Sequence, residues 1–207
     1  MSFFKTVPAL LSALALFCMF SAQAVTFEQV QNVFQKTKIL RARFTQEKKL
    51  KEISTPLTAQ GFMLLAQEKG LIWQQESPFE MRLAATDTSF IQSMPGMPDT
   101  VLDAKSNPQM FEIITTLKAI LTGDQKSLEQ NFALDFSALE DTRWQLKLTP
   151  LREPFSLIFA DIILRGEQYL ESIELNDTQK DVTMLVFSEQ TTKPDTLSAK
   201  EQTYFGR

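Results

Sequence analysis

The pattern of hydrophobic and polar positions in residues 57–92 predicts four short β-strands. Segments that favour extended structure are separated by Gly, Pro or charged clusters, as in an antiparallel meander. Apolar side chains occupy alternate positions, and a period of two places them on one face of a sheet. The residues of this face are Ala59, Gly61, Met63, Leu65, Leu71, Trp73, Phe79, Met81 and Leu83. Such a face forms either the packed core of a β domain or the wall of a cavity for an apolar ligand.

Two other regions show the spacing of amphipathic helices. The first begins at Thr26, whose side chain can form a capping box with Gln29, and carries an apolar stripe at Phe27, Val30, Val33 and Phe34. The second begins at Asn107-Pro108 and ends at Gly123, which are typical start and stop residues. Its apolar residues are Met110, Phe111, Ile114, Leu117, Ile120 and Leu121. A shorter helix over 124–130 is expected to follow.

Extended segments make up most of the remaining chain. We expect strands over 39–50, 132–136, 144–148, 155–164, 169–175 and 182–186, giving ten or eleven with the first four. The predicted fold is mainly β (α+β), an open and incomplete antiparallel barrel of about 11 strands covered by helices. A sandwich fits less well because the helices are too few to cover two faces. The helices of 107–130 either cap the β core or form a lid that can lift.

The first 24 residues have the features of a cleaved signal peptide. Lys5 supplies a positive charge, residues 7–20 are apolar, and Ala22-Gln23-Ala24 matches a signal-peptidase site. The apolar run is too short to span a bilayer comfortably. The single cysteine, Cys18, lies inside this segment, so the mature chain would contain no disulfide. We therefore expect an exported periplasmic protein in which residues 25–207 form a single domain.

Composition excludes most enzymatic chemistry. The chain has no His, which rules out His-based triads and His metal sites. A mature chain without Cys has no thiol nucleophile, and no Gly-rich phosphate loop or metal-ligand spacing is present. The net charge is −4, and removal of Lys5 makes it −5, which disfavours nucleic acid as a partner. We expect a non-enzymatic protein without cofactor or metal; a carboxylate hydrolase using Asp161 stays open, although such a residue is more typical of a bulge or a barrel end.

Short motifs occur in a recognisable order along the chain. Residues 43–46 read Arg-Phe-Thr-Gln, and Gly61-Phe62, Leu71-Ile72-Trp73 and Ser77-Pro78 follow. Residues 144–150 then read Trp-Gln-Leu-Lys-Leu-Thr-Pro, and residues 173–175 read Ile-Glu-Leu with Asp177 after them. This order resembles the periplasmic lipoprotein carrier family, LolA, over nearly the whole mature chain. The chain looks like a divergent member.

The resemblance implies an incomplete β-barrel whose apolar interior receives the acyl chains of outer-membrane lipoproteins. It implies a cargo taken from an inner-membrane transporter and passed to an outer-membrane acceptor by a carrier that we expect to be a monomer. Family members commonly have an Arg that ties the lid shut. Alignment on Trp73 places Gln67 at that position, and Glu68 stands where the family has Pro. The lid latch and the identity of the cargo are therefore open.

A set of apolar side chains is expected to line the cavity and its lid. These residues are Phe27, Phe34, Phe44, Met63, Leu65, Leu71, Trp73, Phe79, Met81, Phe90, Phe111, Ile114 and Leu117. The alternative for the same residues is a tightly packed core. Three function classes follow: a carrier of lipoprotein or lipid, a sensor or interaction module that binds a protein through exposed Phe62 or Leu64, and an enzyme with a carboxylate pair.

Overall fold

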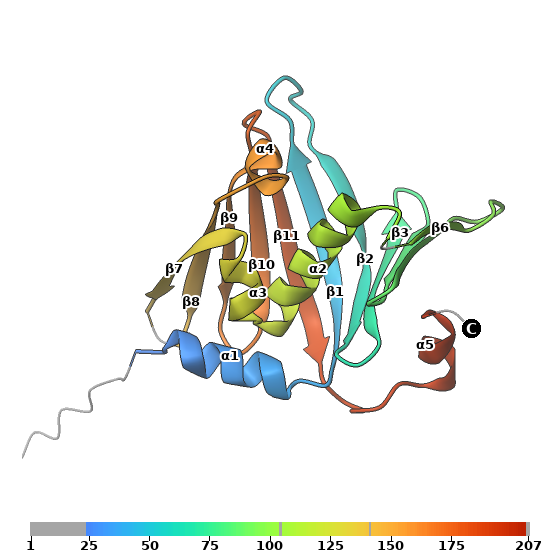
Figure 1. The fold of residues 1–207 in the computed structure, drawn as a ribbon, viewed down its shortest axis with the longest axis horizontal. Helices are drawn as coiled ribbons and strands as arrows, with labels where there is room; N and C mark the ends of the chain where they lie inside the picture. The colour runs from blue at the N-terminus through green and yellow to red at the C-terminus, as the bar shows by residue number, and fades with distance from the viewer. Residues whose placement is uncertain (1–23, 104, 141, 206–207) are drawn as a thin grey trace, which may run out of the picture.

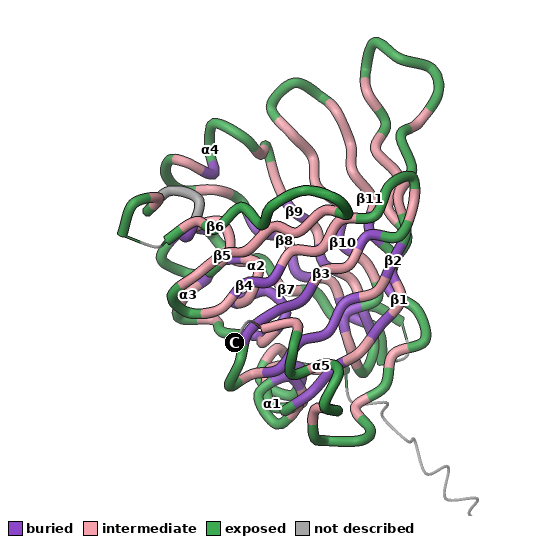
Figure 2. Tube along the Cα trace, turned by 90° about the vertical axis from the view of Figure 1, so that its right-hand side faces the viewer, coloured by how far each residue is buried: buried purple, intermediate pink, exposed green. Residues whose placement is uncertain are grey.

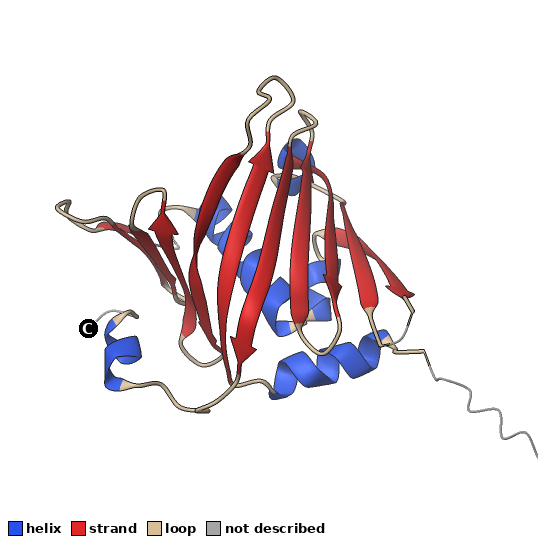
Figure 3. Cartoon of the chain, turned by 180° about the vertical axis from the view of Figure 1, so that it is seen from behind, coloured by secondary structure: helices blue, strands red, loops and turns tan. Residues whose placement is uncertain are grey.

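A single antiparallel sheet of eleven strands organises the molecule (Figure 1). The computed structural model describes residues 24–205 except 104 and 141, so the predicted signal peptide lies outside the described residues apart from Ala24. The strand order is β6-β5-β4-β3-β2-β1-β11-β10-β9-β8-β7. Helices α1, α2 and α3 lie against one face, the inner face, while the middle strands are uncovered on the outer face (Figure 3). The predicted open, one-sheet architecture is confirmed.

The first half of the sheet is a meander. Its strands are β1 (Ile39–Lys49), β2 (Leu57–Ala66), β3 (Gly70–Ser77), β4 (Met81–Ala85), β5 (Ser89–Ser93) and β6 (Thr100–Asp103). The four strands expected within 57–92 are confirmed as β2 to β5. The edge strand β6 was not predicted, because its four residues are too few to show a period of two.

The second half is also a meander, consisting of β7 (Phe132–Ala138), β8 (Trp144–Pro150), β9 (Phe159–Gly166), β10 (Leu170–Asp177) and β11 (Val182–Thr191). The strand expected over 155–164 is wrong in its first part, where the chain forms the short helix α4 (Phe155–Ile158) before β9 begins. A run that is apolar on both sides does not distinguish a helical turn from a buried strand.

The two meanders join through one ladder between β1 and β11. Phe44 pairs with Phe187 and Thr45 with Val186 in this antiparallel ladder. On its other side β1 pairs with β2, where Phe44 stands opposite Gly61. Strand β1 is therefore the central strand of the sheet and joins its two halves.

The sequence signals for the covering helices hold. In α1 (Phe27–Lys36), the Thr26 hydroxyl accepts from the Gln29 amide at 3.3 Å, and the Gln29 side chain accepts from the Thr26 amide at 2.9 Å. Helix α2 (Pro108–Thr122) ends at Gly123, which has φ 66°. A Cβ at Gly123 would lie 3.0 Å from Cδ2 of Phe34, so glycine also permits the contact between the two helices. The short helix α3 (Gln125–Glu129) follows.

The apolar core has two parts on opposite faces of the sheet. The larger part lies on the inner face beneath the helices and includes Phe34, Phe44, Met63, Trp144 and Phe187. The smaller part lies on the outer face, and the buried stretches of β1, β2 and β3 are visible in Figure 2. Its buried members are Ile39, Leu64, Ala66, Ile72 and Ala84.

The C-terminal segment covers this outer part of the core. The chain forms helix α5 (Ala199–Thr203) here, and Tyr204 and Phe205 pack against the outer-face cluster. Leu64 is therefore buried, and Phe62 lies 6.2 Å from the Tyr204 ring, centroid to centroid. The expectation that Phe62 or Leu64 forms an exposed partner surface is wrong.

One arginine fastens this segment to the sheet. Arg41 on β1 donates to both carboxylate oxygens of Glu201, at 2.6 and 2.9 Å. Its guanidinium also donates to the carbonyl oxygens of Pro194 and Thr196, at 2.8 and 3.0 Å. The hydrogen bonds from Arg41 lower the pKa of Glu201 to about 2.

Candidate functional site

An apolar cavity of about 260 Å³ lies between the inner face of the sheet and helix α2. Strands β3, β4 and β5 form one wall, and α4, β9, β10 and β11 contribute to another. Helix α2 supplies the roof. The lining residues are Leu71, Trp73, Leu83, Ala85, Phe90, Ile113, Ile114, Thr116, Leu117, Ile120, Phe155, Phe159, Ile162, Leu175 and Leu185.

The periodicity of each element explains why these side chains meet. In β3 and β4, alternate residues face the same side, and the ladder places Leu83 opposite Trp73 and Ala85 opposite Leu71. In α2, spacings of three and four bring Ile113, Leu117 and Ile120 onto one face of the helix. An apolar helix face and an apolar sheet face thus oppose each other across the cavity.

Aromatic packing fixes the wall at Trp73. Its ring stacks on Phe44, with centroids 3.8 Å apart and an interplanar angle of 26°. It also contacts Phe187 edge to face at 6.3 Å. Phe44 is almost completely buried, so this side of the cavity is held by the core and does not depend on the roof.

The chemistry of the lining is almost purely hydrophobic. Among the described residues that line the cavity, none carries a charge, and Thr116 alone carries a hydroxyl. Burial of an unpaired ion in such surroundings is strongly unfavourable. The cavity therefore accommodates uncharged, apolar groups.

The roof is tied to the rest of the molecule by polar contacts near the surface. On α2, Lys118 Nζ lies 2.5 Å from Asp87 Oδ1, and Glu112 Oε1 lies 2.9 Å from Arg152 Nη2. The side chain of Asp87 is 76 % exposed and that of Arg152 is 55 % exposed. Ion pairs this exposed contribute little to stability. These two contacts therefore restrain α2 only weakly.

Helix α1 is linked to both α2 and the sheet. The Gln31 amide donates to the Gly123 carbonyl at the end of α2, at 3.3 Å. The Gln67 amide donates to the carbonyls of Phe34 and Gln35 at the end of α1, at 3.0 and 3.1 Å. Gln67, the position at which the resemblance places a latching Arg, therefore hydrogen-bonds a covering helix, and that helix is α1.

The expected site residues separate into those that line the cavity, those that pack beside it and those that lie outside it. Leu71, Trp73, Phe90, Ile114 and Leu117 line the cavity. Five others belong to the core beside it without lining it: Phe27, Phe34, Phe44, Met63 and Leu65. Phe111 is buried on α2 but does not line the cavity.

Phe79 and Met81 lie outside the cavity. Phe79 is 53 % exposed and follows the last residue of β3, where the alternation of the strand no longer applies. Met81 is half-buried at the start of β4, and its Sδ lies 3.5 Å from the amide nitrogen of Gln92. The alternation of β3 does not continue across the turn that leads to β4, so the sequence pattern wrongly placed these two residues in the cavity wall.

Several lining residues were not on the expected list. Leu83, Leu175 and Leu185 lie in strands whose apolar face or segment was recognised, but nothing in the sequence pairs the two meanders. Phe155 and Phe159 were assigned to a single strand, and the helical turn α4 brings both to the cavity. Thr116 was overlooked because it is polar.

A larger groove of about 550 Å³ lies at one end of β1, β2 and β11. Glu47, Lys49 and Thr58 line it together with Met184 and Val186. A groove lined by charged side chains is a poor environment for apolar groups, so we take the smaller, uncharged cavity as the candidate site.

Features of other functional classes are not found in the described part of the chain. No group of three or more His, Cys, Asp or Glu side chains is placed to hold a metal ion there. The helices described are all too short or too polar to cross a membrane.

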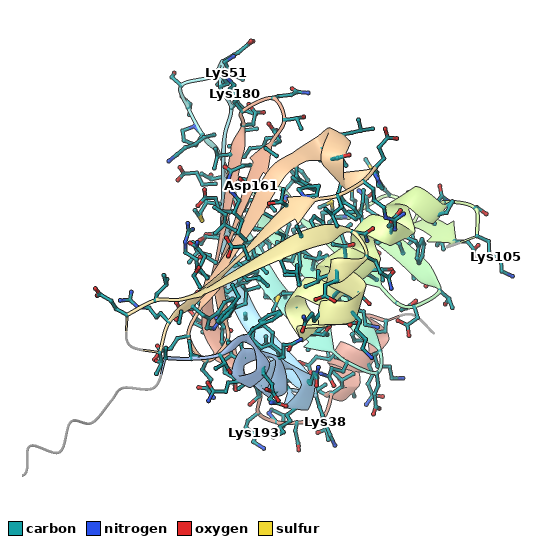
Figure 4. All side chains as sticks on the ribbon, turned by 60° about the vertical axis from the view of Figure 1, so that its left-hand side comes forward. Lys38, Lys51, Lys105, Asp161, Lys180 and Lys193 are labelled. Atoms are coloured by element: carbon teal, nitrogen blue, oxygen red, sulfur yellow. The ribbon has the colours of Figure 1, made fainter. Side chains whose placement is uncertain are left out.

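Asp161 is not placed as a catalytic acid. It lies on β9 (Figure 4), where its carboxylate accepts from Asn176 at 2.7 Å and pairs with Lys147 at 3.0 Å. Burial raises its pKa, but the hydrogen bonds from Asn176 and Lys147 outweigh that effect and lower the pKa overall. The carboxylate therefore stays ionised. The ladder shifts register close by, between Asn176 and Asp177.

The fold and the cavity define a class of protein, a one-sheet β protein whose apolar inner face encloses a hollow beneath helices. The chain belongs to the family described as outer membrane lipoprotein carrier protein LolA, whose model matches residues 35–201. It is 24 % identical over 172 residues to the outer-membrane lipoprotein carrier protein of Methylococcus capsulatus, covering 82 % of this chain and 79 % of that protein.

Solved structures with a similar chain path include a LolA superfamily protein from Nitrosomonas europaea, with a TM-score of 0.48 and 10 % identity over 86 % of this chain and 97 % of that one. The Pseudomonas aeruginosa MucA/MucB complex contains another, with a TM-score of 0.45 and 12 % identity over 84 % of this chain and 58 % of that one.

Proposed function

We propose that this protein is a periplasmic carrier that shields the acyl chains of a lipoprotein, or of another lipidated cargo, during transfer from the inner to the outer membrane. The observation that carries the proposal is the uncharged cavity beneath helix α2. Membership of the LolA family supports a lipoprotein or lipid carrier role in general. A donor in the inner membrane and an acceptor in the outer membrane complete the proposal, with the carrier acting as a monomer.

The size of the cavity sets how much cargo the closed form accepts. A dry cavity of about 150 Å³ holds one benzene molecule of six carbons, so 260 Å³ has room for about ten carbons. A chain of roughly sixteen carbons exceeds this capacity at the same packing. We expect helix α2 to move outward to cover a long acyl chain completely, and its exposed ion pairs are the contacts that would break.

Energetics favour a cavity of this kind in a carrier. Each methylene transferred from water contributes about 0.8 kcal/mol, so about ten buried carbons contribute roughly 8 kcal/mol. That is enough to hold a chain while the carrier crosses an aqueous compartment. Release then requires a partner that opens the roof or offers the chain an equally apolar surface.

Mass spectrometry of gently purified protein tests the proposal. We expect acyl-containing material to co-purify with the mature chain, and a neutral fluorescent probe such as N-phenyl-1-naphthylamine to bind the delipidated protein. Trp73→Glu places a charge in the wall and should abolish probe binding. Phe79→Glu, at an exposed position, is the matched control and should bind normally. A folded wild-type protein that takes up neither acyl material nor probe would refute the carrier proposal.

A further inference from the structure

One hydroxyl interrupts the hydrophobic lining of the cavity. The side chain of Thr116 on α2 is 6 % exposed and lines the cavity among aliphatic and aromatic neighbours. No described residue forms a hydrogen bond with its hydroxyl, and the hydroxyl is not among the fully enclosed side-chain atoms that lack a partner, so it is open to the cavity. A hydroxyl that faces an apolar cavity without a partner is unfavourable, and Val would have nearly the same shape without that penalty.

Two other threonines, at the ends of α2 and α1, behave differently. Thr122 donates its hydroxyl to the Lys118 carbonyl at 2.9 Å, and Thr37 donates to the Val33 carbonyl at 2.8 Å. Both use the carbonyl four residues earlier, which is the usual partner of a threonine in a helix. Thr116 does not use that partner, so its hydroxyl is available to a molecule in the cavity.

We infer that Thr116 donates a hydrogen bond to the carbonyl oxygen of an acyl ester or amide held in the cavity. This inference rests on the proposed carrier function and narrows its ligand to neutral acyl derivatives. A hydrocarbon offers no acceptor for the hydroxyl. An ionised fatty acid brings a negative charge into a lining where no described residue carries a compensating cation. An esterified or amidated chain satisfies both conditions, because its carbonyl accepts a hydrogen bond and carries no net charge.

The length of the acyl chain that this ligand would carry is limited by the size of the cavity. At about ten carbons, a medium-length chain with its carbonyl fills the volume of the cavity. The hydroxyl then adds selectivity, while the hydrophobic lining supplies most of the affinity. A site that uses a single hydrogen bond in this way prefers the acylated molecule to an alkane of similar length without binding it irreversibly.

Ligand competition with the full mature chain and three of its variants tests the inference. N-phenyl-1-naphthylamine is displaced by methyl decanoate, undecane or decanoate, and the three affinities are compared for wild type, Thr116→Val, Thr116→Ser and Thr115→Val. Thr115 is the neighbouring, exposed threonine and serves as the matched control. Thr116→Ser keeps the hydroxyl, and Thr116→Val keeps the shape.

We expect the wild type to prefer methyl decanoate to undecane, and Thr116→Val to lose about two- to tenfold of that preference. Thr116→Ser and Thr115→Val should keep it, and decanoate should bind weakly to all four proteins. An unchanged preference in Thr116→Val, or an equal loss for methyl decanoate and undecane, would overturn the role of the hydroxyl while leaving the carrier proposal intact. Failure of the probe and of every ligand to bind the wild type would overturn both.

Discussion

The rings of Phe44 and Trp73 stack at a centroid distance of 3.8 Å, although one residue lies on β1 and the other on β3. Strand β2 runs between them, and its Gly61 stands directly opposite Phe44. A Cβ at this glycine would lie 1.9 Å from the Gln74 carbonyl oxygen, so no larger residue fits there. The stacked pair joins the packed core to the cavity, because Phe44 belongs to the first and Trp73 lines the second.

Shortening Phe44 should destabilise the fold and enlarge the cavity. Phe44→Ala is expected to lower the free energy of unfolding by about 3–5 kcal/mol, since a fully buried ring is lost and the rigid surroundings collapse only partly. Phe44→Leu should cost less. Urea denaturation followed by tryptophan fluorescence measures both changes. A loss below about 1 kcal/mol for Phe44→Ala would show that the stack is not part of the rigid wall.

The Arg41–Glu201 pair should make stability depend on acid pH. The pKa of Glu201 is about 2 in the folded protein, against an ordinary value of 4.5. A folded-state pKa below the unfolded value gives stability that is present above about pH 4.5 and is lost as pH falls towards about 2. The substitution Glu201→Gln should therefore lower the free energy of unfolding by on the order of 2 kcal/mol at pH 7. Near the folded-state pKa of about 2, the substitution should have almost no effect.

Thermal unfolding of wild type and Glu201→Gln across this pH range measures the effect. Glu171→Gln, at an exposed position on β10, is a suitable control and should follow the wild type. The same pH dependence of thermal stability in wild type and Glu201→Gln would contradict the stabilising role assigned to the Arg41–Glu201 pair.

Removing the ion pairs of α2 should change the rate of ligand uptake more than the stability of the fold. Lys118→Met with Glu112→Gln removes both ion pairs of α2, and because these pairs are exposed the free energy of unfolding should fall by less than about 1 kcal/mol. Stopped-flow uptake of N-phenyl-1-naphthylamine should be faster in the double variant. High salt should accelerate the wild type towards the same rate by screening the pairs. Equal rates at low salt would show that α2 is not the element that opens.

Gln67 should stabilise the covering helix through its side-chain amide. Gln67→Leu keeps the approximate size but removes two hydrogen bonds to the last turn of α1, so unfolding should become easier by about 1–2 kcal/mol. Glu68→Leu, at the exposed neighbouring position, is the control. Denaturant midpoints at constant slope measure the difference. An unaffected Gln67→Leu variant would mean that α1 is held by its apolar face alone.

The elements that could be predicted from the sequence are those that depend on residues close together in the chain. The alternation in β2 to β4 and the capping box of Thr26 depend on neighbouring residues, and both were predicted. The pairing of Phe44 with Phe187 depends on residues far apart in the chain. A period of two shows which residues share a face of the sheet, but not which strands lie side by side. For the same reason the lining by Leu175 and Leu185 could not be predicted. Helix α5 was not predicted because the packing of its neighbours Leu197, Tyr204 and Phe205 on the outer-face cluster requires the sheet to exist first.

The ladder between β1 and β11 has a consequence for how the protein is made. Each meander is assembled from local pairings, but the hydrogen-bonding edge of β1 that faces β11 stays unsatisfied until Val182–Thr191 becomes available near the end of the chain. During synthesis, an eleven-residue strand is thus exposed along one side, and such an edge promotes aggregation. The first meander is therefore most prone to aggregate before β11 has been made.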